Sequence, residues 1–122
     1  MDPKDLQMRT KNFAIRIISL VRYLQNDPMG RILGNQQLLR SGTAVAANYR
    51  AVCRAKSAKD FISKLGIVVE EADETQFWLE ILLEAGMVKS SLVEPLLKEA
   101  GEIVAIMTAS KNSAIKNQKS KK

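Results

Sequence analysis

The chain has 122 residues, 46% of them apolar, a net charge of +6, one cysteine and no histidine. This is the length of one domain, the N-terminus lacks a signal-peptide pattern, and no apolar run approaches the roughly 18 residues of a membrane span, so we expect a cytoplasmic protein with no membrane contact. Because the commonest general base and zinc ligand is absent, we predict a protein that is not an enzyme and uses no metal or cofactor.

The first predicted helix spans residues 3–24. Asp2 can cap its N-terminus, Pro3 suits its first turn, and the Asp-Pro-Met-Gly segment that follows marks its end. Its main apolar stripe contains Leu6, Phe13, Ile17, Leu20, Val21 and Leu24. Ile15 and Ile18 widen this stripe beyond what one bundle core needs. The extra width favours burial against another subunit, and the alternative is a surface helix with scattered apolar residues.

The second predicted helix spans residues 29–55. Its seam repeats at alternating spacings of three and four and contains Leu38, Ser41, Val45, Asn48 and Val52. The small residues that would let a neighbouring helix approach closely are Gly34, Gly42, Ala44, Ala46, Ala47 and Ala51. A buried amide must find a partner, so we interpret Asn48 as a residue that fixes the register of the bundle. We expect Cys53 to fill a small space in the core or in an interface.

The third predicted helix begins after a Ser57 cap and continues to Ala85, where Gly86 stops it. Its seam keeps the heptad spacing and contains Phe61, Leu65, Val68, Ala72, Thr75, Leu79 and Leu82. The fourth helix starts at Ser90 or Ser91, and its apolar stripe contains Val93, Leu96, Leu97, Ala100, Val104 and Met107. The connections are short, so consecutive helices should lie antiparallel.

These four helices predict an all-α protein, an antiparallel up-down-up-down four-helix bundle, over residues 1–110. From Lys111 onward the apolar period is lost. Residues 111–122 are therefore expected to form a basic, mostly disordered tail.

The charges are segregated along the chain. Residues 1–56 hold ten basic and three acidic residues, residues 57–102 hold four basic and ten acidic residues, and residues 103–122 hold five basic residues and no acidic one. The basic first half can pair with the acidic segment inside the bundle or across a subunit interface, or it can face polyanions. The sequence favours ion pairing.

One acidic cluster suggests catalysis or metal binding at first sight; its members are Glu70, Glu71, Asp73 and Glu74. Carboxylate-bridged metal sites in helical bundles also need Glu-x-x-His pairs on two helices, which this chain cannot supply. We therefore predict that the cluster is an acidic pairing face. Its expected partners are Arg40, Arg50 or Arg54 of the second helix, or a neighbouring subunit.

The candidates for contact with nucleic acid or with another subunit are basic residues of the first half. They are Arg9, Lys11, Arg16, Arg22, Arg40, Arg50, Arg54 and Lys56, and the lysines of the tail could add phosphate contacts. The aromatic residues Tyr23, Tyr49 and Trp78 are too scattered to form a stacking platform, so we expect them to pack. Trp78 joins Asn48 as a candidate for a buried residue that makes the packing specific.

Residues 37–86 resemble the four-helix bundle family encoded in intervening sequences of bacterial 23S ribosomal RNA genes. The residues that carry the resemblance are Leu38, Arg40, Ser41 and Asn48, then Lys59, Asp60, Phe61 and Lys64, then Glu70, Glu71, Asp73, Glu74, Trp78, Leu79 and Glu80. The resemblance implies an antiparallel four-helix bundle that assembles into a ring, typically a homopentamer. It also implies a distant relation to the accessory variability proteins of diversity-generating retroelements, basic pentameric barrels that bind reverse transcriptase and nucleic acid.

Two functional hypotheses follow from the sequence. The first is a non-enzymatic, ring-forming scaffold whose basic surfaces bind RNA, DNA or a nucleic-acid enzyme. The second is a purely structural or protein-partner adaptor, in which the acidic third helix neutralises the basic residues. A metal enzyme that uses Glu70, Glu71 and Asp73 is a third and weaker hypothesis.

Overall fold

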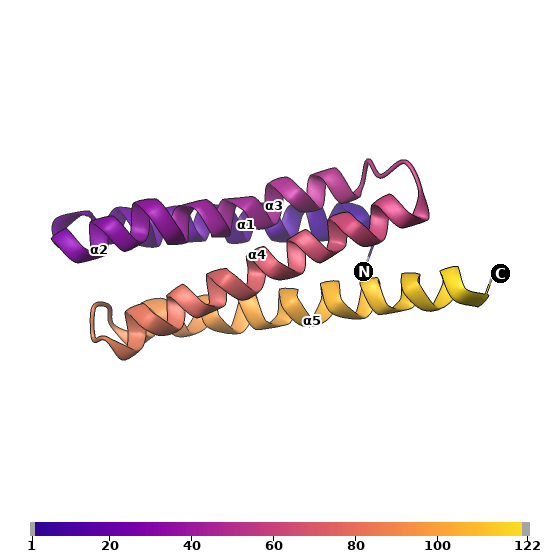
Figure 1. The fold of residues 1–122 in the computed structure, drawn as a ribbon. Coiled ribbons are helices and arrows are strands. Elements are labelled where there is room, and N and C mark those ends of the chain that lie inside the picture. The colour runs from indigo at the N-terminus through magenta and orange to yellow at the C-terminus, as the bar shows by residue number, and fades with distance from the viewer. Residues whose placement is uncertain (1, 121–122) are drawn as a thin grey trace.

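The computed structural model describes residues 2–120, and these residues form four long helical rods joined by short connections (Figure 1). The elements are α1 Pro3–Tyr23, η1 Leu24–Asn26, α2 Pro28–Leu33, η2 Gly34–Leu38, α3 Leu39–Val52, α4 Ala58–Glu84 and α5 Ser90–Ser120. Consecutive rods run antiparallel, so the predicted all-α four-helix bundle is confirmed. Over residues 2–120, no helix combines the length and the hydropathy needed to cross a membrane.

The helix ends are set by the capping residues and the glycine that were predicted from the sequence. The Asp2 carboxylate accepts a hydrogen bond from the Asp5 backbone N–H at 3.0 Å, and the Ser57 hydroxyl accepts one from the Asp60 N–H at 3.0 Å. Each bond satisfies an N–H group that has no partner within its own helix. Gly86 has a φ of +69°, a conformation that glycine adopts readily, and the chain turns there towards α5.

The second predicted helix is present as a rod that changes geometry along its length. It begins at Pro28 and ends at Val52, and the segment η2 between α2 and α3 is a wider π-helical turn. A π turn accommodates an additional residue within a continuous rod. The sequence pattern predicted the rod but not this turn.

The predicted seams form the core. Each seam residue of α4 from Leu65 to Leu82 is at most 1% exposed, and Phe61 is partly buried beside them. The six residues of the main stripe predicted for the first helix are all buried, five of them on α1 and Leu24 in η1. Ile15 is 54% exposed, so the additional apolar face of α1 lies outside the core of the single chain.

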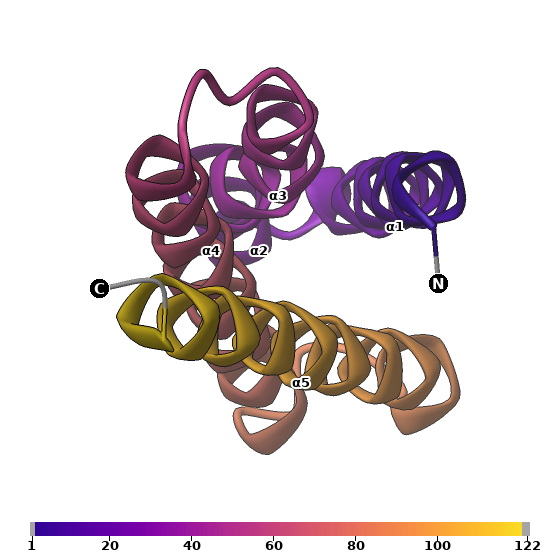
Figure 2. The same cartoon turned by 90° about the vertical axis from the view of Figure 1, so that its right-hand side faces the viewer.

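The distance of closest approach and the length of contact differ between pairs of helices. An added Cβ at Gly42 would lie 2.8 Å from the Ile17 Cγ2 atom, so α1 and α3 approach as closely as the small residues of α3 allow. The helix α4 packs along both α3 and α5, whereas α5 contacts α1 over only part of its length. Figure 2 shows α5 crossing α4 obliquely, with α1 and α4 on different sides of the molecule.

The expectation of a disordered tail is corrected. Residues 111–120 continue α5 as helix, while residues 121–122 lie outside the described part of the chain. Two causes account for the difference. Extending an existing helix is far easier than starting one, and the segment packs on the end of the bundle, where Ala114, Asn117 and Gln118 line a hollow with Pro3 and Tyr49.

Candidate nucleic-acid interface

Arg9 of α1 forms ion pairs with two glutamates of α5. Its Nε donates to Glu99 Oε2 at 2.8 Å and its Nη2 donates to Glu99 Oε1 at 2.7 Å, a fork-to-fork geometry, and Nη2 also reaches Glu102 Oε1 at 2.6 Å. The hydrogen bonds from Arg9 lower the pKa of Glu99, and those from Glu99 raise the pKa of Arg9. The sequence had not suggested α5 as the partner of this arginine.

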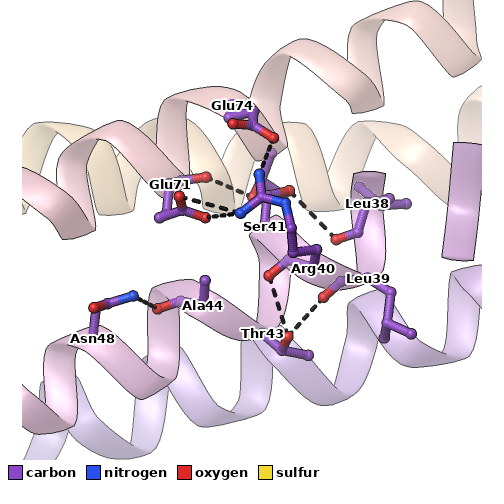
Figure 3. Close-up of polar contacts among 10 residues, drawn as sticks. Leu38, Leu39, Arg40, Ser41, Thr43, Ala44, Asn48, Glu71 and Glu74 are labelled. Carbon is purple, nitrogen blue, oxygen red and sulfur yellow. Dashed lines mark hydrogen bonds and ion pairs between the residues drawn. The ribbon is translucent and has the colours of Figure 1, made fainter. Parts of the chain in front are cut away.

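Arg40 is the residue that meets the predicted acidic face (Figure 3). Its Nη1 lies 3.0 Å from Glu71 Oε2, and its Nη2 donates to Glu74 Oε2. The predicted pairing between the second helix and the acidic cluster is confirmed for Arg40. Within residues 2–120 it is not formed by Arg50 or Arg54, which lie nearer the end of α3.

Those two arginines instead line a groove between α1 and α3. The groove has a volume of about 550 Å³, and its lining consists of Gln7, Lys11, Thr43, Ala46, Ala47, Arg50 and Arg54. Of the described residues, none that lines it is acidic, and Lys11, Arg50 and Arg54 form no ion pair with any residue of 2–120. We call this the cationic groove. The small side chains of Ala46 and Ala47 in its lining leave room for a ligand beside three positive charges.

The remaining basic candidates are spread over other surfaces. Arg16 lines a hollow between α1 and α5, where its charge also helps to lower the pKa of Glu99. Arg22 is exposed on α1. The Lys56 backbone N–H donates to Asp60 Oδ2 at 3.0 Å, and its side chain lines the hollow at the end of the bundle.

The antiparallel order gathers basic residues at one end of the bundle. Figure 1 shows that the N-terminus of α1, the connection from α3 to α4 and the C-terminal turns of α5 all lie at this end. The lysines of α5, Lys111, Lys116 and Lys119, therefore belong to the same end of the molecule as the cationic groove. Sequence reasoning identified both groups but could not place them together.

The acidic cluster is divided by the helical period of α4. Glu71 and Glu74 face Arg40, whereas Glu70 and Asp73 are exposed without an ion-pair partner in residues 2–120. Within the same residues, no three His, Cys, Asp or Glu side chains are placed to hold one metal ion.

The two candidates for buried specificity differ from expectation. Asn48 is partly buried, and its Nδ2 donates to the Ala44 carbonyl oxygen of its own helix at 2.9 Å (Figure 3), so within residues 2–120 its amide bonds to no other helix. Trp78 is also partly buried. Its ring meets Phe77 edge to face at 5.0 Å between centroids, and its Nε1 atom is buried without an acceptor among the described residues. Cys53 is exposed, so it does not fill the core of the single chain.

The chain is similar to a known protein family and to a solved structure. The model of the 23S rRNA-intervening sequence protein family matches residues 4–109. A solved structure from Bacteroides thetaiotaomicron, described as a protein of unknown function from the S23 ribosomal protein family, is 32% identical in sequence. It aligns over 92% of this chain and 99% of its own chain, with a TM-score of 0.84. No curated protein matches the sequence. The family match covers most of the chain, and the protein therefore belongs to the 23S rRNA-intervening sequence protein family.

Proposed function

We propose that this protein is a non-enzymatic scaffold that assembles with copies of itself and holds RNA or DNA by the phosphate backbone in the cationic groove. One observation carries the proposal. Lys11, Arg50 and Arg54 line one groove whose described lining contains no acidic residue, whereas Arg9 and Arg40 are paired with carboxylates. Phosphate oxygens are the acceptors that lysine and arginine favour at such a surface.

The chemistry of the groove supports contact with the backbone and not with the bases. Arg50 lies in the last turn of α3, and Arg54 lies in the turn that follows the helix. Because both line the same groove, their two guanidinium groups can contact neighbouring phosphates of one strand. Gln7 and Thr43 add neutral hydrogen-bonding groups, and the described lining contains no aromatic ring on which a base could stack. Such a site binds without reading sequence.

Assembly would multiply the effect of each groove. A ring of identical copies, as the family resemblance implies, presents several grooves to one strand. Several weak phosphate contacts on one particle raise the overall affinity through effective concentration. The scaffold thus needs neither a deep pocket nor a catalytic residue in the single chain.

The test is the salt dependence of binding to fluorescently labelled RNA and DNA oligonucleotides, measured by anisotropy between about 50 and 200 mM salt. The wild-type protein should lose affinity steeply as salt rises. The triple variant K11A/R50A/R54A should bind more weakly, and its log–log slope should be smaller by about one for each phosphate that it no longer neutralises.

The matched control is Arg31→Ala, which removes an exposed arginine of α2 outside the groove. It should leave affinity and slope unchanged. The proposal fails if the wild type retains no nucleic acid at low salt, if retention is independent of salt, or if the triple variant behaves like the control.

A protein-partner adaptor without nucleic-acid binding is the second candidate function. It is supported by the ion pairs of Arg9 and Arg40, which direct basic residues to acidic ones. The charge reversals Arg40→Glu and Arg50→Glu separate the two functions. Loss of assembly favours the adaptor, whereas loss of nucleic-acid binding with an intact particle favours the scaffold that holds nucleic acid.

A further inference from the structure

The outward side of α1 carries an apolar stripe with basic ends. Met8 and Ile15 are 64% and 54% exposed although both are large and apolar. They lie two helical turns apart, opposite the buried side of the helix. The α1 stripe, as we define it, consists of Lys4, Met8, Ile15, Ser19 and Arg22, all of them exposed. Lys11 of the cationic groove lies at its edge, between Met8 and Ile15.

The outward side of α4 carries a second apolar stripe, and this one is acidic. Ile67 and Phe77 are 42% and 49% exposed. The α4 stripe consists of Ile67, Glu70, Asp73, Phe77, Glu80 and Glu84, at spacings of three or four residues. Its four carboxylates are exposed and form no ion pair with any residue of 2–120.

The two stripes are complementary in length, apolarity and charge. From Lys4 to Arg22 the α1 stripe is about 27 Å long, and from Ile67 to Glu84 the α4 stripe is about 26 Å long, at about 1.5 Å per residue. Each has two large apolar residues within a straight seam, the pattern by which two helices pack side by side. The flanking charges are basic on one stripe and acidic on the other.

From this match we propose that the α1 stripe of one copy docks on the α4 stripe of the next copy. The inference rests on the self-assembly in the proposed function and names the two surfaces that carry it. Phe77 is suited to be the central contact. Its ring is held edge to face against Trp78, so little conformational freedom is lost when a neighbouring helix covers it.

The position of the stripes determines the kind of assembly. In one copy α1 and α4 lie on different sides of the molecule (Figure 2), and each packs mainly against other helices. One copy therefore cannot cover its own stripes. Two different surfaces that meet between copies make a head-to-tail contact, which leaves one stripe of each kind open until the copies close into a ring.

The experiment uses two variants that each damage one stripe, Ile15→Glu and Phe77→Glu. Each places a carboxylate at an apolar contact, so each variant alone should be monomeric by light scattering. An equimolar mixture should form a particle of two chains, because the first variant retains its α4 stripe and the second retains its α1 stripe. The damaged stripes cannot pair with each other, since both carry a new negative charge.

The control is Ile32→Glu, which alters an exposed apolar residue of α2 outside both stripes and should assemble like the wild type. Helix content by circular dichroism shows whether each variant is folded, and Ile15→Ser and Phe77→Ser replace any variant that loses helix.

Three results would overturn the assignment of the stripes while leaving self-assembly intact. They are wild-type assembly by Phe77→Glu, two monomeric variants whose mixture stays monomeric, and disassembly of Ile32→Glu along with the other two. A monomeric wild type would instead end the self-assembly on which the inference rests.

Discussion

Gly42 shows how the absence of one side chain sets the distance between two helices. It lies in the interior of α3, where glycine is a poor helix former. The Ile17 side chain of α1 occupies the space that a Cβ at this position would need, at 2.8 Å. Gly101 in α5 is different, because an added Cβ would meet its nearest neighbour, the Gln76 Nε2 atom, at an ordinary 3.5 Å.

The two glycines give a paired prediction for stability. Gly101→Ala should raise the free energy of unfolding by up to about 1 kcal/mol, because alanine is the better helix former. Gly42→Ala gains the same propensity but forces α1 and α3 apart, at a cost of about 1 to 3 kcal/mol. We expect urea unfolding to show Gly42→Ala below Gly101→Ala by at least about 1 kcal/mol. Equal stabilisation of both variants would contradict the close approach of α1 and α3.

At the scale of elements, the seam between α1 and α5 differs from the others. It is short, and its polar part is the fork between Arg9 and Glu99, whose side chains are 21% and 17% exposed. Because Arg9 lowers the pKa of Glu99, the folded chain binds the Glu99 proton less tightly than the unfolded chain does. This contribution to stability is present above the ordinary pKa of a glutamate and is lost as the pH falls through the lower pKa of the folded state.

The corresponding prediction concerns Glu99→Gln. At neutral pH the variant should be less stable than the wild type by on the order of 1 kcal/mol, since it loses charge-assisted hydrogen bonds. The difference should begin to shrink as the pH falls below the ordinary pKa of a glutamate, about 4, and should vanish only below the lower pKa of the folded Glu99 carboxyl, where the wild-type side chain is also protonated. Urea unfolding at several pH values measures this difference in the free energy of unfolding.

The control is Glu94→Gln, on the exposed side of α5, whose difference from the wild type should not depend on the ion pair with Arg9. A difference for Glu99→Gln that stays constant down to acid pH would contradict the role of the fork.

The elements were largely predictable from the sequence because their signals are local. Asp2 and Ser57 cap helices, Gly86 ends one, and the heptad seam of α4 is buried as expected. The length of α5 was not predictable, because the packing of Ala114 and Gln118 on the end of the bundle comes from residues distant in sequence. The local hydrogen bond of Asn48 also escaped prediction, since a seam position does not reveal which partner its amide selects.

At the scale of the molecule, the candidate site was predictable only as a set of residues. The sequence names Lys11, Arg50 and Arg54, but only the pairing of α1 with α3 brings them into one groove. It also groups Arg9 and Arg40 with them, although both are neutralised by glutamates of other helices. Charge along a sequence indicates which partners are available, and tertiary packing decides which charges remain free.

The basic end of the bundle leads to a prediction about the last turns of α5. Lys116 and Lys119 are exposed and lie at the same end as the cationic groove. If nucleic acid extends from the groove over this end, the double variant K116Q/K119Q should bind more weakly, with a salt slope smaller by up to about two. The controls are Lys89→Gln and Lys98→Gln, because both lysines lie near the start of α5, towards the opposite end of the bundle. Unchanged slopes for the double variant would confine binding to the groove.

The proposed self-assembly rests on the α1 and α4 stripes, two apolar surfaces with opposite flanking charges that the single chain leaves exposed. The mass of the wild-type particle in solution, from light scattering during gel filtration at moderate salt, tests this most directly. We predict a particle several times the 13.6 kDa of one chain. A particle of 13.6 kDa that persists as the protein concentration rises would contradict assembly through the stripes.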